Sequence, residues 1–234
     1  MSLVEIAGVI LATAQRRVEV VAQNISNMTT AGYKARRQFS GLVAGDSLEQ
    51  GRSRSNDERS IVDFTGGKLM NTGNPLDFAL QGRGFFVVRT GDATYYTRDG
   101  QFRRDADGRL TTADGASVQG ANGDVSVGAG AVSVLADGTI MQDGQPLGRL
   151  AVADFADTSV LRPAGGGLFA APSGAASDLS SPQIRQGMLE ASNVSTADEM
   201  VSMMAALRSA EAGQRIAQVY DDLMGRAVTA FGQT

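Results

Sequence analysis

The chain of 234 residues contains no cysteine, no histidine and no tryptophan. The first two absences exclude disulfides, thiol nucleophiles and imidazole bases, together with the commonest zinc ligands. The absence of cysteine does not fix the compartment, because disulfides are optional outside the cytosol. It suits a protein that travels unfolded through a narrow export channel. No cofactor and no metal ion is expected.

An excess of either charge is also lacking, since 21 basic and 25 acidic residues give a formal net charge of −4. This balance favours neither a nucleic-acid binder nor a protein of anionic membrane surfaces. Lys34, Arg36 and Arg37 form a local basic run. No second basic cluster extends it, so we interpret the run as a solvated or subunit-facing patch.

Long hydrophobic runs are absent beyond the first residues, so no direct membrane insertion is expected. Residues 1–14 are apolar, but they lack a basic start, contain Glu5 and lead directly into Arg16 and Arg17. A secretory signal peptide has the opposite charge pattern at its start. Any export is therefore expected to use a route without a cleaved signal.

The N-terminal segment has the pattern of an amphipathic helix. Apolar residues recur at alternating steps of three and four, as in a heptad seam: Val4, Ala7, Leu11, Ala14, Val18, Val21, Ile25 and Met28. Thr29, Thr30 and Gly32 then end the helix, and Gly32 suits a left-handed cap.

The C-terminal segment repeats this pattern. Ser195 is a candidate N-cap, and Asp198 and Glu199 place negative charge in the first turn, where the helix dipole favours it. The seam that follows contains small residues, which allow another helix to approach closely: Met203, Ala206, Ala210, Gly213, Ala217, Tyr220, Met224, Ala227 and Phe231.

Two interpretations of these helices remain open. An apolar stripe is usually the core face of a globular domain. However, both helices lie at the ends of the chain, and both seams favour small or flexible residues over large aromatic ones. We therefore favour a coiled-coil-like pair of terminal helices over ordinary burial.

The segment from Asn74 to Leu168 has the pattern of a β domain. Asp-Gly and Asn-Gly pairs, which are strong hairpin signals, lie at positions 99, 107, 114, 122, 137 and 143. The expected strands between them are Phe85–Arg89, Thr94–Arg98, Gln101–Arg104, Arg109–Thr112, Ser117–Gln119, Val132–Leu135 and Leu150–Phe155.

These patterns predict an α+β fold in which terminal helices pair as an inner domain beside a central all-β domain of hairpins. Gly45 to Ser60 is polar without a period, and Pro163 to Ser181 is rich in Gly, Ala, Ser and Pro. The expected division is a first helix and turn (1–44), an exposed arm (45–73), a β domain (74–168), a linker (169–186) and a final helix (187–234).

Three motifs that resemble chemical sites are better explained by structure. Gly82-Arg83-Gly84 lacks the third glycine of a phosphate loop and precedes a strand instead of a helix. Asp105 to Gly108 resembles the start of a calcium loop, but Ala116 replaces the liganding glutamate at position twelve, so a β-turn is expected. Asp221 and Asp222 are adjacent and lie on diverging faces of a helix.

Nucleophilic catalysis is not supported either. A serine nucleophile would need a lysine as its base because no histidine is present. The only lysines are Lys34 and Lys68, and neither lies in a recognisable catalytic motif. We therefore expect no enzymatic activity and no catalytic residue.

Three blocks of sequence together resemble the flagellar axial proteins of the rod and hook. The first block is Ala22 to Lys34, an Asn-rich end of a helix followed by a Thr-x-Gly-aromatic turn; Met28 departs mildly from it. The second runs from Pro75 to Val88 and continues through Tyr96-Thr97-Arg98-Asp99-Gly100 to Asp114-Gly115. The third is Gly187 to Val194, which leads into the last helix.

The resemblance implies a structural subunit of the bacterial flagellar basal-body rod, which polymerises through its terminal helices to transmit torque. It implies as partners further copies of the chain, other rod proteins and the flagellar type III export apparatus, with a location in the periplasm-spanning rod. The interface residues it implies are Val4, Leu11, Val18, Val21, Asn24, Ile25, Asn27, Gly32, Tyr33, Asn193, Met203, Ala206, Ala210, Gly213, Ala217, Tyr220 and Met224.

Within this family the chain is most similar to the longer rod proteins that carry a β domain, and the proximal class is favoured over the distal class. The distal class typically has an extended segment after the first helix and a longer chain, whereas Gly45 to Ser60 is short. The rival interpretation is a carbohydrate-binding or adhesin-like β module on a helical stalk, with Tyr95, Tyr96 or Phe102 as exposed aromatic residues.

Overall fold

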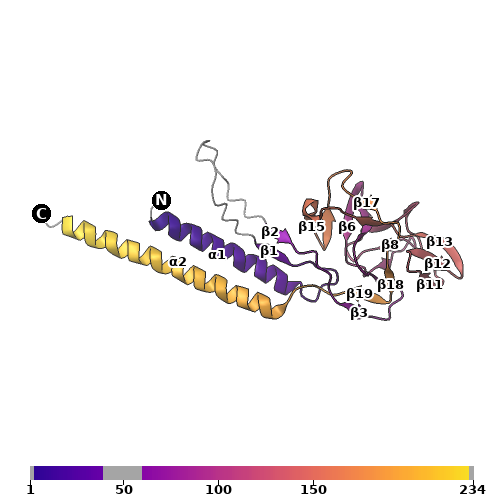
Figure 1. The fold of residues 1–234 in the computed structure, drawn as a ribbon, viewed down its shortest axis with the longest axis horizontal. Coiled ribbons are helices and arrows are strands. Elements are labelled where there is room, and N and C mark those ends of the chain that lie inside the picture. The colour runs from indigo at the N-terminus through magenta and orange to yellow at the C-terminus, as the bar shows by residue number, and fades with distance from the viewer. Residues whose placement is uncertain (1–2, 39–59, 232–234) are drawn as a thin grey trace. The chain divides into compact units, whose positions relative to one another are not determined.

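The computed structural model describes residues 3–38 and 60–231, and it divides the chain into two compact units (Figure 1). The helical unit consists of Met1–Ser26, Arg36–Ile61 and Val194–Thr234, and the β unit consists of Asn27–Ala35 and Val62–Asn193. Each unit is thus built from segments that are not continuous in the sequence. Helices at both ends and strands between them confirm the predicted α+β class.

The helical unit is dominated by α1 (Leu3–Ser26) and α2 (Thr196–Phe231), which lie side by side in Figure 1. Ser195 precedes α2, and its Oγ accepts a bond from the backbone N–H of Asp198 at 3.4 Å, which confirms the predicted N-cap. The unit also contains β1 (Arg36–Gln38), which pairs with β2 (Ser60–Val62). Neither described helix is apolar over a length sufficient to cross a bilayer.

The two helices run antiparallel. Asn24, near the end of α1, bonds to Glu199 in the first turn of α2, whereas Ala7 and Ile10, near the start of α1, lie against Gly213. The helices therefore pack along one another within a single chain. The supercoiled geometry of a coiled coil stays a prediction.

The β unit consists of short strands joined by tight turns. In chain order after β2, its strands are β3 (Leu69–Asn71), β4 (Phe78–Leu80), β5 (Phe85–Thr90), β6 (Ala93–Thr97), β7 (Arg103–Arg104), β8 (Leu110–Thr111), β9 (Ser117–Gly120), β10 (Gly123–Asp124), β11 (Val132–Val134), β12 (Thr139–Gln142), β13 (Gln145–Arg149), β14 (Val152–Asp154), β15 (Arg162–Gly165), β16 (Leu168–Ala170), β17 (Ser177–Asp178), β18 (Ile184–Gln186) and β19 (Met188–Glu190). A short 3-10 helix (Thr158–Val160) lies between β14 and β15.

The largest sheet has the order β15-β16-β6-β5-β9-β8-β7, with β10 on β9 and with β14 joining β5 to β17. A second sheet has the order β11-β12-β13, and the pairs β18-β4 and β19-β3 bring late strands back to early ones. The strands paired here in the β unit are antiparallel. The predicted strand ends are confirmed to within two residues, because the Asp-Gly and Asn-Gly pairs at 107, 114, 122, 137 and 143 fix where their hairpins reverse. The hairpin signal at Asp99-Gly100 is wrong, because β6 and β7 pair with other strands and not with each other.

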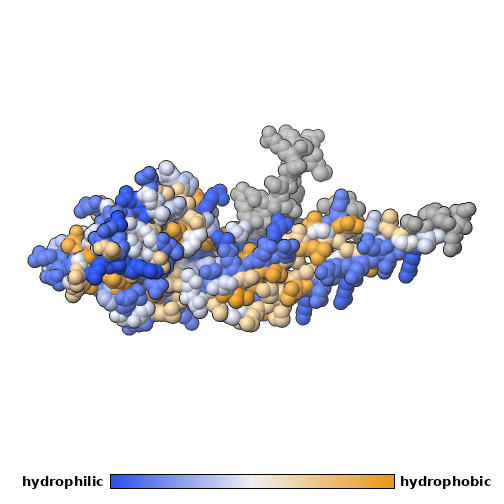
Figure 2. Space-filling model, turned by 180° about the vertical axis from the view of Figure 1, so that it is seen from behind, coloured by the Kyte–Doolittle hydropathy of each residue, from blue (hydrophilic) through white to orange (hydrophobic). Residues whose placement is uncertain are grey.

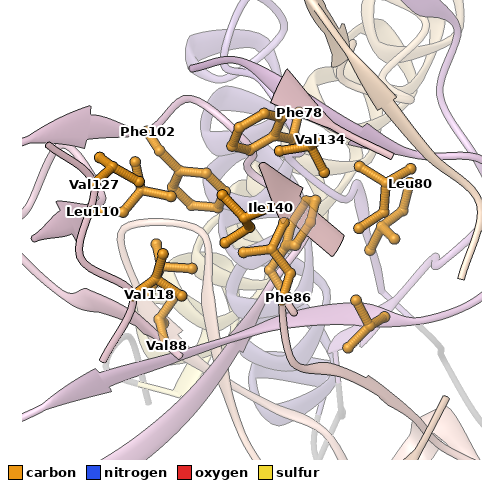
Figure 3. Close-up of a cluster of buried hydrophobic side chains, with 14 of the residues drawn as sticks. Phe78, Leu80, Phe86, Val88, Phe102, Leu110, Val118, Val127, Val134 and Ile140 are labelled. Carbon is orange, nitrogen blue, oxygen red and sulfur yellow. The ribbon is translucent and has the colours of Figure 1, made fainter. Parts of the chain in front are cut away.

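The core of the β unit is apolar and lies between its sheets (Figure 3). Phe78, Phe86 and Phe102 form its aromatic centre, with Val88, Val118 and Ile140 packed around them. Phe86 and Phe102 meet edge to face with ring centroids 5.3 Å apart. A smaller cluster contains Phe85, Phe155 and Phe169. Phe102 is therefore a core residue and not the exposed aromatic group that the glycan-binding alternative requires.

The observed units differ from the expected domain boundaries at both ends of the β domain. Residues 27–35, expected with the first helix, and residues 187–193, expected with the last helix, belong to the β unit. Residues 169–186, expected as a linker, contain β17 and β18. Residues 45–59, the first part of the arm expected at 45–73, lie outside the described residues. The later part of that arm contains β2 and β3.

The turn glycines serve two different purposes. Gly108, Gly115, Gly123, Gly138 and Gly144 all have positive φ, as the Asp-Gly and Asn-Gly signals predict. Gly100 is different, because a Cβ atom there would lie 1.6 Å from the carbonyl oxygen of Phe78. The N–H of Phe78 donates to Gly100 O at 3.0 Å, so this glycine is required for a close approach of two backbones.

We expect Gly100→Ala to destabilise the β unit by about 2 kcal/mol or more, because the new methyl group meets backbone atoms that cannot move independently. Urea unfolding followed by tyrosine fluorescence in a Tyr220→Phe background measures this, since the remaining tyrosines, Tyr33, Tyr95 and Tyr96, all belong to the β unit. Gly148→Ala is the matched control: a Cβ atom there meets no atom within 4 Å, and the change should be within about 0.5 kcal/mol. Equal effects of the two substitutions would contradict this explanation of Gly100.

Candidate assembly site

The contact between α1 and α2 is a seam of small buried residues. Ala7, Ala14 and Val21 of α1 and Ala206 and Gly213 of α2 are all buried. A Cβ atom added at Gly213 would lie 3.1 Å from Cγ2 of Ile10 and from Cγ of Leu11. The absence of a side chain at Gly213 thus allows the two helices to approach closely.

Most of the predicted interface residues lie within this intrachain seam or beside it. Val21, Ala206 and Gly213 are buried, and Val4 and Met224 are exposed at 46% and 49%. The other predicted seam residues are half-buried: Leu11, Val18, Ile25, Met203, Ala210, Ala217 and Tyr220. Their assignment to contacts between subunits stays a prediction, because in this structure the seam joins two helices of one chain.

Asn24 is the buried polar residue of the helical unit. Its Oδ1 accepts the N–H of Arg36 at 2.9 Å, and its Nδ2 donates to Arg36 O at 2.8 Å and to Glu199 Oε1 at 2.9 Å. One amide therefore satisfies both backbone groups of a residue in β1 and also contacts the first turn of α2. A buried amide is stable only when it is bonded in this way.

The other predicted residues of the N-terminal block belong to the β unit. Asn27 lies just after α1, and its Oδ1 accepts the hydroxyl of Thr30 at 3.2 Å. Gly32 has a φ of +67°, as expected for a left-handed residue, but α1 has already ended at Ser26. A Cβ atom at Gly32 would lie 2.2 Å from the backbone N of Asp99, so Gly32 is needed for packing inside the β unit.

Asn193 performs in the β unit the task that Asn24 performs in the helical unit. Its Oδ1 accepts the N–H of Ala35 at 2.7 Å, and its Nδ2 donates to Asp63 O at 2.8 Å and to Thr65 O at 3.1 Å. The N–H of Asn193 also donates to Tyr33 O at 3.4 Å. This predicted residue therefore joins three segments that are far apart in the sequence.

A buried ionic cluster of Lys34, Arg98 and Glu190 lies in the same part of the β unit. Lys34 Nζ is 2.5 Å from Glu190 Oε1, and Arg98 Nη1 is 3.3 Å from Glu190 Oε2. The N–H of Gly67 also donates to Glu190 Oε1, at 2.8 Å. Burial lowers the pKa of Lys34 and of Arg98, and the charge of Glu190 opposes the shift in both groups.

The cluster corrects the sequence-based interpretation of Lys34. The run Lys34, Arg36 and Arg37 was interpreted as one solvated or subunit-facing patch, which is wrong for Lys34: its side chain is 0% exposed. Charge composition alone cannot reveal a partner 156 residues away. The available signal was that Lys34 and Glu190, of opposite charge, each lie inside a block that resembles the family.

Large apolar residues remain uncovered on the helices, away from the small-residue seam. On α2 they include Met200, Val201, Met204 and Leu207, which are all exposed. At 3.6 residues per turn, these four positions face away from Ala206 and Gly213. Figure 2 shows hydrophobic residues in orange along the helices. The helical unit thus has one covered face of small residues and a second, uncovered face of large ones.

The acidic side chains of the described residues are scattered or paired with cations. Among them, no group of three or more acidic side chains could hold a metal ion. The predicted β-turn at Asp105 is confirmed, because the N–H of Gly108 donates to Asp105 O at 3.2 Å. Arg109 also donates to the carboxylates of Asp105 and Asp107, at 2.9 Å in each case. These carboxylates are therefore bound by a neighbouring cation of the same turn.

Three sequence families match successive parts of the chain. "Flagella basal body rod protein" matches residues 11–34, "Flagellar hook protein FlgE/F/G D1 domain" matches residues 79–145, and "Flagellar basal body rod FlgEFG protein C-terminal" matches residues 185–230. The matched ranges include most of α1, the centre of the β unit and nearly all of α2.

Characterised relatives are similar along nearly their whole length. The flagellar basal-body rod protein FlgG of Agrobacterium fabrum is 30% identical over 254 aligned positions, which cover 95% of this chain and 97% of the relative. The rod protein FlgF of Caulobacter vibrioides is 30% identical over 233 positions and 94% of each chain. FlgF of Salmonella typhimurium is 33% identical over 226 positions and 89% of each chain.

We expect Gly213→Leu to destabilise the packing of α1 on α2 by about 1–3 kcal/mol, because the new side chain meets Ile10 and Leu11. Helical ellipticity should be lost at lower urea concentration than in the parent chain, while the tyrosine transition of the β unit is unchanged. The control Ala212→Leu adds the same side chain at a neighbouring exposed position and should leave both transitions in place. A helical transition that Gly213→Leu does not shift would contradict the close packing at this position.

Proposed function

The chain belongs to the flagellar basal-body rod protein family, and from this premise we propose how it assembles and where in the rod it lies. It is a structural subunit of the rod and not an enzyme. The proposal is that subunits polymerise through the uncovered faces of their terminal helices, so that torque passes along repeated helix contacts.

The observation that carries this proposal is the division of apolar residues between two faces of α2. The small residues Ala206 and Gly213 are covered by α1 of the same chain, whereas Met204 and Leu207 are about half exposed. Burying a large apolar side chain is worth roughly 1.5–3 kcal/mol. Several such residues on one face therefore supply a substantial driving force for association.

The partners on this face are proposed to be further copies of the chain and other rod proteins. A contact between two different patches does not close on itself and generates a helical assembly. Of the residues expected at the interface from the sequence, Val4 and Met224 are exposed and available for such contacts. The covered seam residues are proposed to act indirectly, by holding α1 and α2 together.

We further propose that the chain lies in the proximal part of the rod. The alignment with the FlgG relative spans 254 positions, more than the 234 residues of this chain, whereas the alignments with the two FlgF relatives span 233 and 226. Because these alignments cover 95%, 94% and 89% of this chain, the FlgG relative has more aligned positions without a counterpart in the chain than either FlgF relative, which supports the shorter proximal class. Finally, we propose that the chain is exported through the flagellar type III apparatus without a cleaved signal. It would then assemble into a rod that spans the periplasm.

The double substitution Met204→Glu/Leu207→Glu tests the uncovered face. We expect motility to fall at least tenfold, because each charge would have to be buried without a partner in the assembled rod. The purified chain should keep its helical ellipticity, since both residues are exposed in the monomer. Ala205→Glu adds charge at an exposed position of α2 that lies about 100° around the helix from Met204 and about 160° from Leu207, and it should preserve motility. Normal motility of the double variant would exclude this face as the contact.

The position in the rod requires a separate experiment. A tag on the chain, located by gold labelling in purified basal bodies, should appear between the export apparatus and the outer ring. Labelling beyond that ring would replace the proximal assignment with the distal one. It would leave the assignment to the rod family unchanged.

A further inference from the structure

The ionic cluster of Lys34, Arg98 and Glu190 has an unequal balance of charge. Two cations share one carboxylate, and all three residues are at most 6% exposed. Asp63 and Asp154 also influence the cluster, the first acting on Lys34 and the second on Arg98. However, Asp154 is shared with the exposed Arg83, at 3.3 Å. Glu190 is therefore the one described acidic residue in direct contact with both buried cations.

The bonds around Glu190 join segments that Asn193 also joins, and the N–H of Ala191 donates to Lys68 O at 2.8 Å beside them. The backbone oxygen of Glu190 accepts the N–H of Gly32 at 2.7 Å, and its carboxylate accepts Gly67 N–H. Lys34 Nζ donates in turn to Thr65 O at 2.8 Å. Segments 27–35 and 63–68 thus meet residues 190–193 at this cluster.

These segments lie outside the main apolar core. The core cluster around Phe86 and Ile140 contains no residue from 27–35, 63–68 or 187–193. Val62 and Phe64 contact only the smaller aromatic cluster and are half-buried there. Loss of the contacts at Glu190 would therefore leave the principal sheet with its own core intact.

We propose that the Glu190 carboxylate is an ionic latch that closes segments 27–35 and 63–68 onto the β unit, and that this latch opens as a local unit. Without the carboxylate, Lys34 and Arg98 are two cations buried close together, which is strongly unfavourable. Arg98 keeps other contacts, since Nη2 donates to Gly82 O at 2.7 Å and its guanidinium lies 5.1 Å from the ring centroid of Phe85. Among the described residues, Thr65 O is the one further acceptor bonded to Lys34 Nζ, so the opening begins at Lys34 and the segment that carries it. This proposal does not depend on the assembly of the chain into a rod.

Because two cations share one carboxylate, the latch predicts which substitutions in the cluster are tolerated. Replacing Glu190 with Gln leaves two buried cations without a carboxylate in contact. Replacing Lys34 with Met leaves one cation with one carboxylate, and the apolar side chain fills the space of the lysine stem. Combining both substitutions removes one of the two unpaired cations. The latch therefore predicts that Lys34→Met partly rescues Glu190→Gln.

Hydrogen exchange followed by mass spectrometry on the full chain tests the latch. In Glu190→Gln, we expect peptides from residues 27–35 and 63–68 to exchange at least tenfold faster, while peptides from β5 and β9 change less than threefold. Lys34→Met alone should change the first two segments less than threefold, and the double variant should lie between the two single variants. Asp107→Asn, which neutralises an exposed carboxylate paired with Arg109, is the matched control and should change neither region.

The proposal is overturned by any of three results. Lys34→Met opens the segments as much as Glu190→Gln, or β5 and β9 open together with them, or Lys34→Met fails to slow exchange in the Glu190→Gln background. If Glu190→Gln cannot be purified in folded form, the double variant decides alone. Recovery of a folded double variant supports the latch, and its failure to fold overturns it.

Discussion

The main constraint on this molecule is that each of its units is built from segments distant in the sequence, and hydrogen-bonding side chains fix the places where those segments meet. Asn24 bonds both backbone groups of Arg36 within the helical unit, and Asn193 bonds the N–H of Ala35 within the β unit. Ala35 and Arg36 are consecutive residues, and the chain passes from the β unit to the helical unit between them. Apolar side chains can shift slightly against one another. A buried amide that is hydrogen-bonded through both its oxygen and its nitrogen instead fixes how the joined segments are aligned.

Local signals in the sequence were sufficient for the two long helices, for seven of the described strands and for part of the topology. Asp-Gly and Asn-Gly pairs located the hairpins, because the conformation of such turns is decided by the two residues themselves. Ser195 marked the start of α2 for the same reason, since an N-cap depends on a few neighbouring residues. The similarity to rod proteins came from blocks that contain Asn24, Gly32 and Asn193, which join distant segments within the helical unit or within the β unit.

The sequence alone did not reveal which distant residues pair with one another. Predictions that depended on such pairings were wrong or stayed untested. Lys34 was assigned to an exposed patch because nothing near it in the sequence indicates a partner at Glu190. Residues 169–186 have the composition of a linker, yet β18 forms a strand because it pairs with β4, about a hundred residues earlier. The predicted seam is buried at Ala7, Ala14, Val21 and Ala206, whereas Val4 and Met224 are exposed and Met28 lies beyond the end of α1. Periodicity alone cannot say whether the partner of a seam is a helix of the same chain or of another.

The pairing of early with late residues also has a consequence for the kinetics of folding. Glu190 and Lys34 are 156 residues apart, and β18 and β19 return to β4 and β3. Contacts of such high sequence separation slow folding, because loop-closure entropy is lost before the contacts form. A chain that leaves a ribosome or a channel with its N-terminus first therefore completes neither unit until residues 184–199 have followed. The topology itself thus delays the closure of both units until the C-terminal segment has emerged.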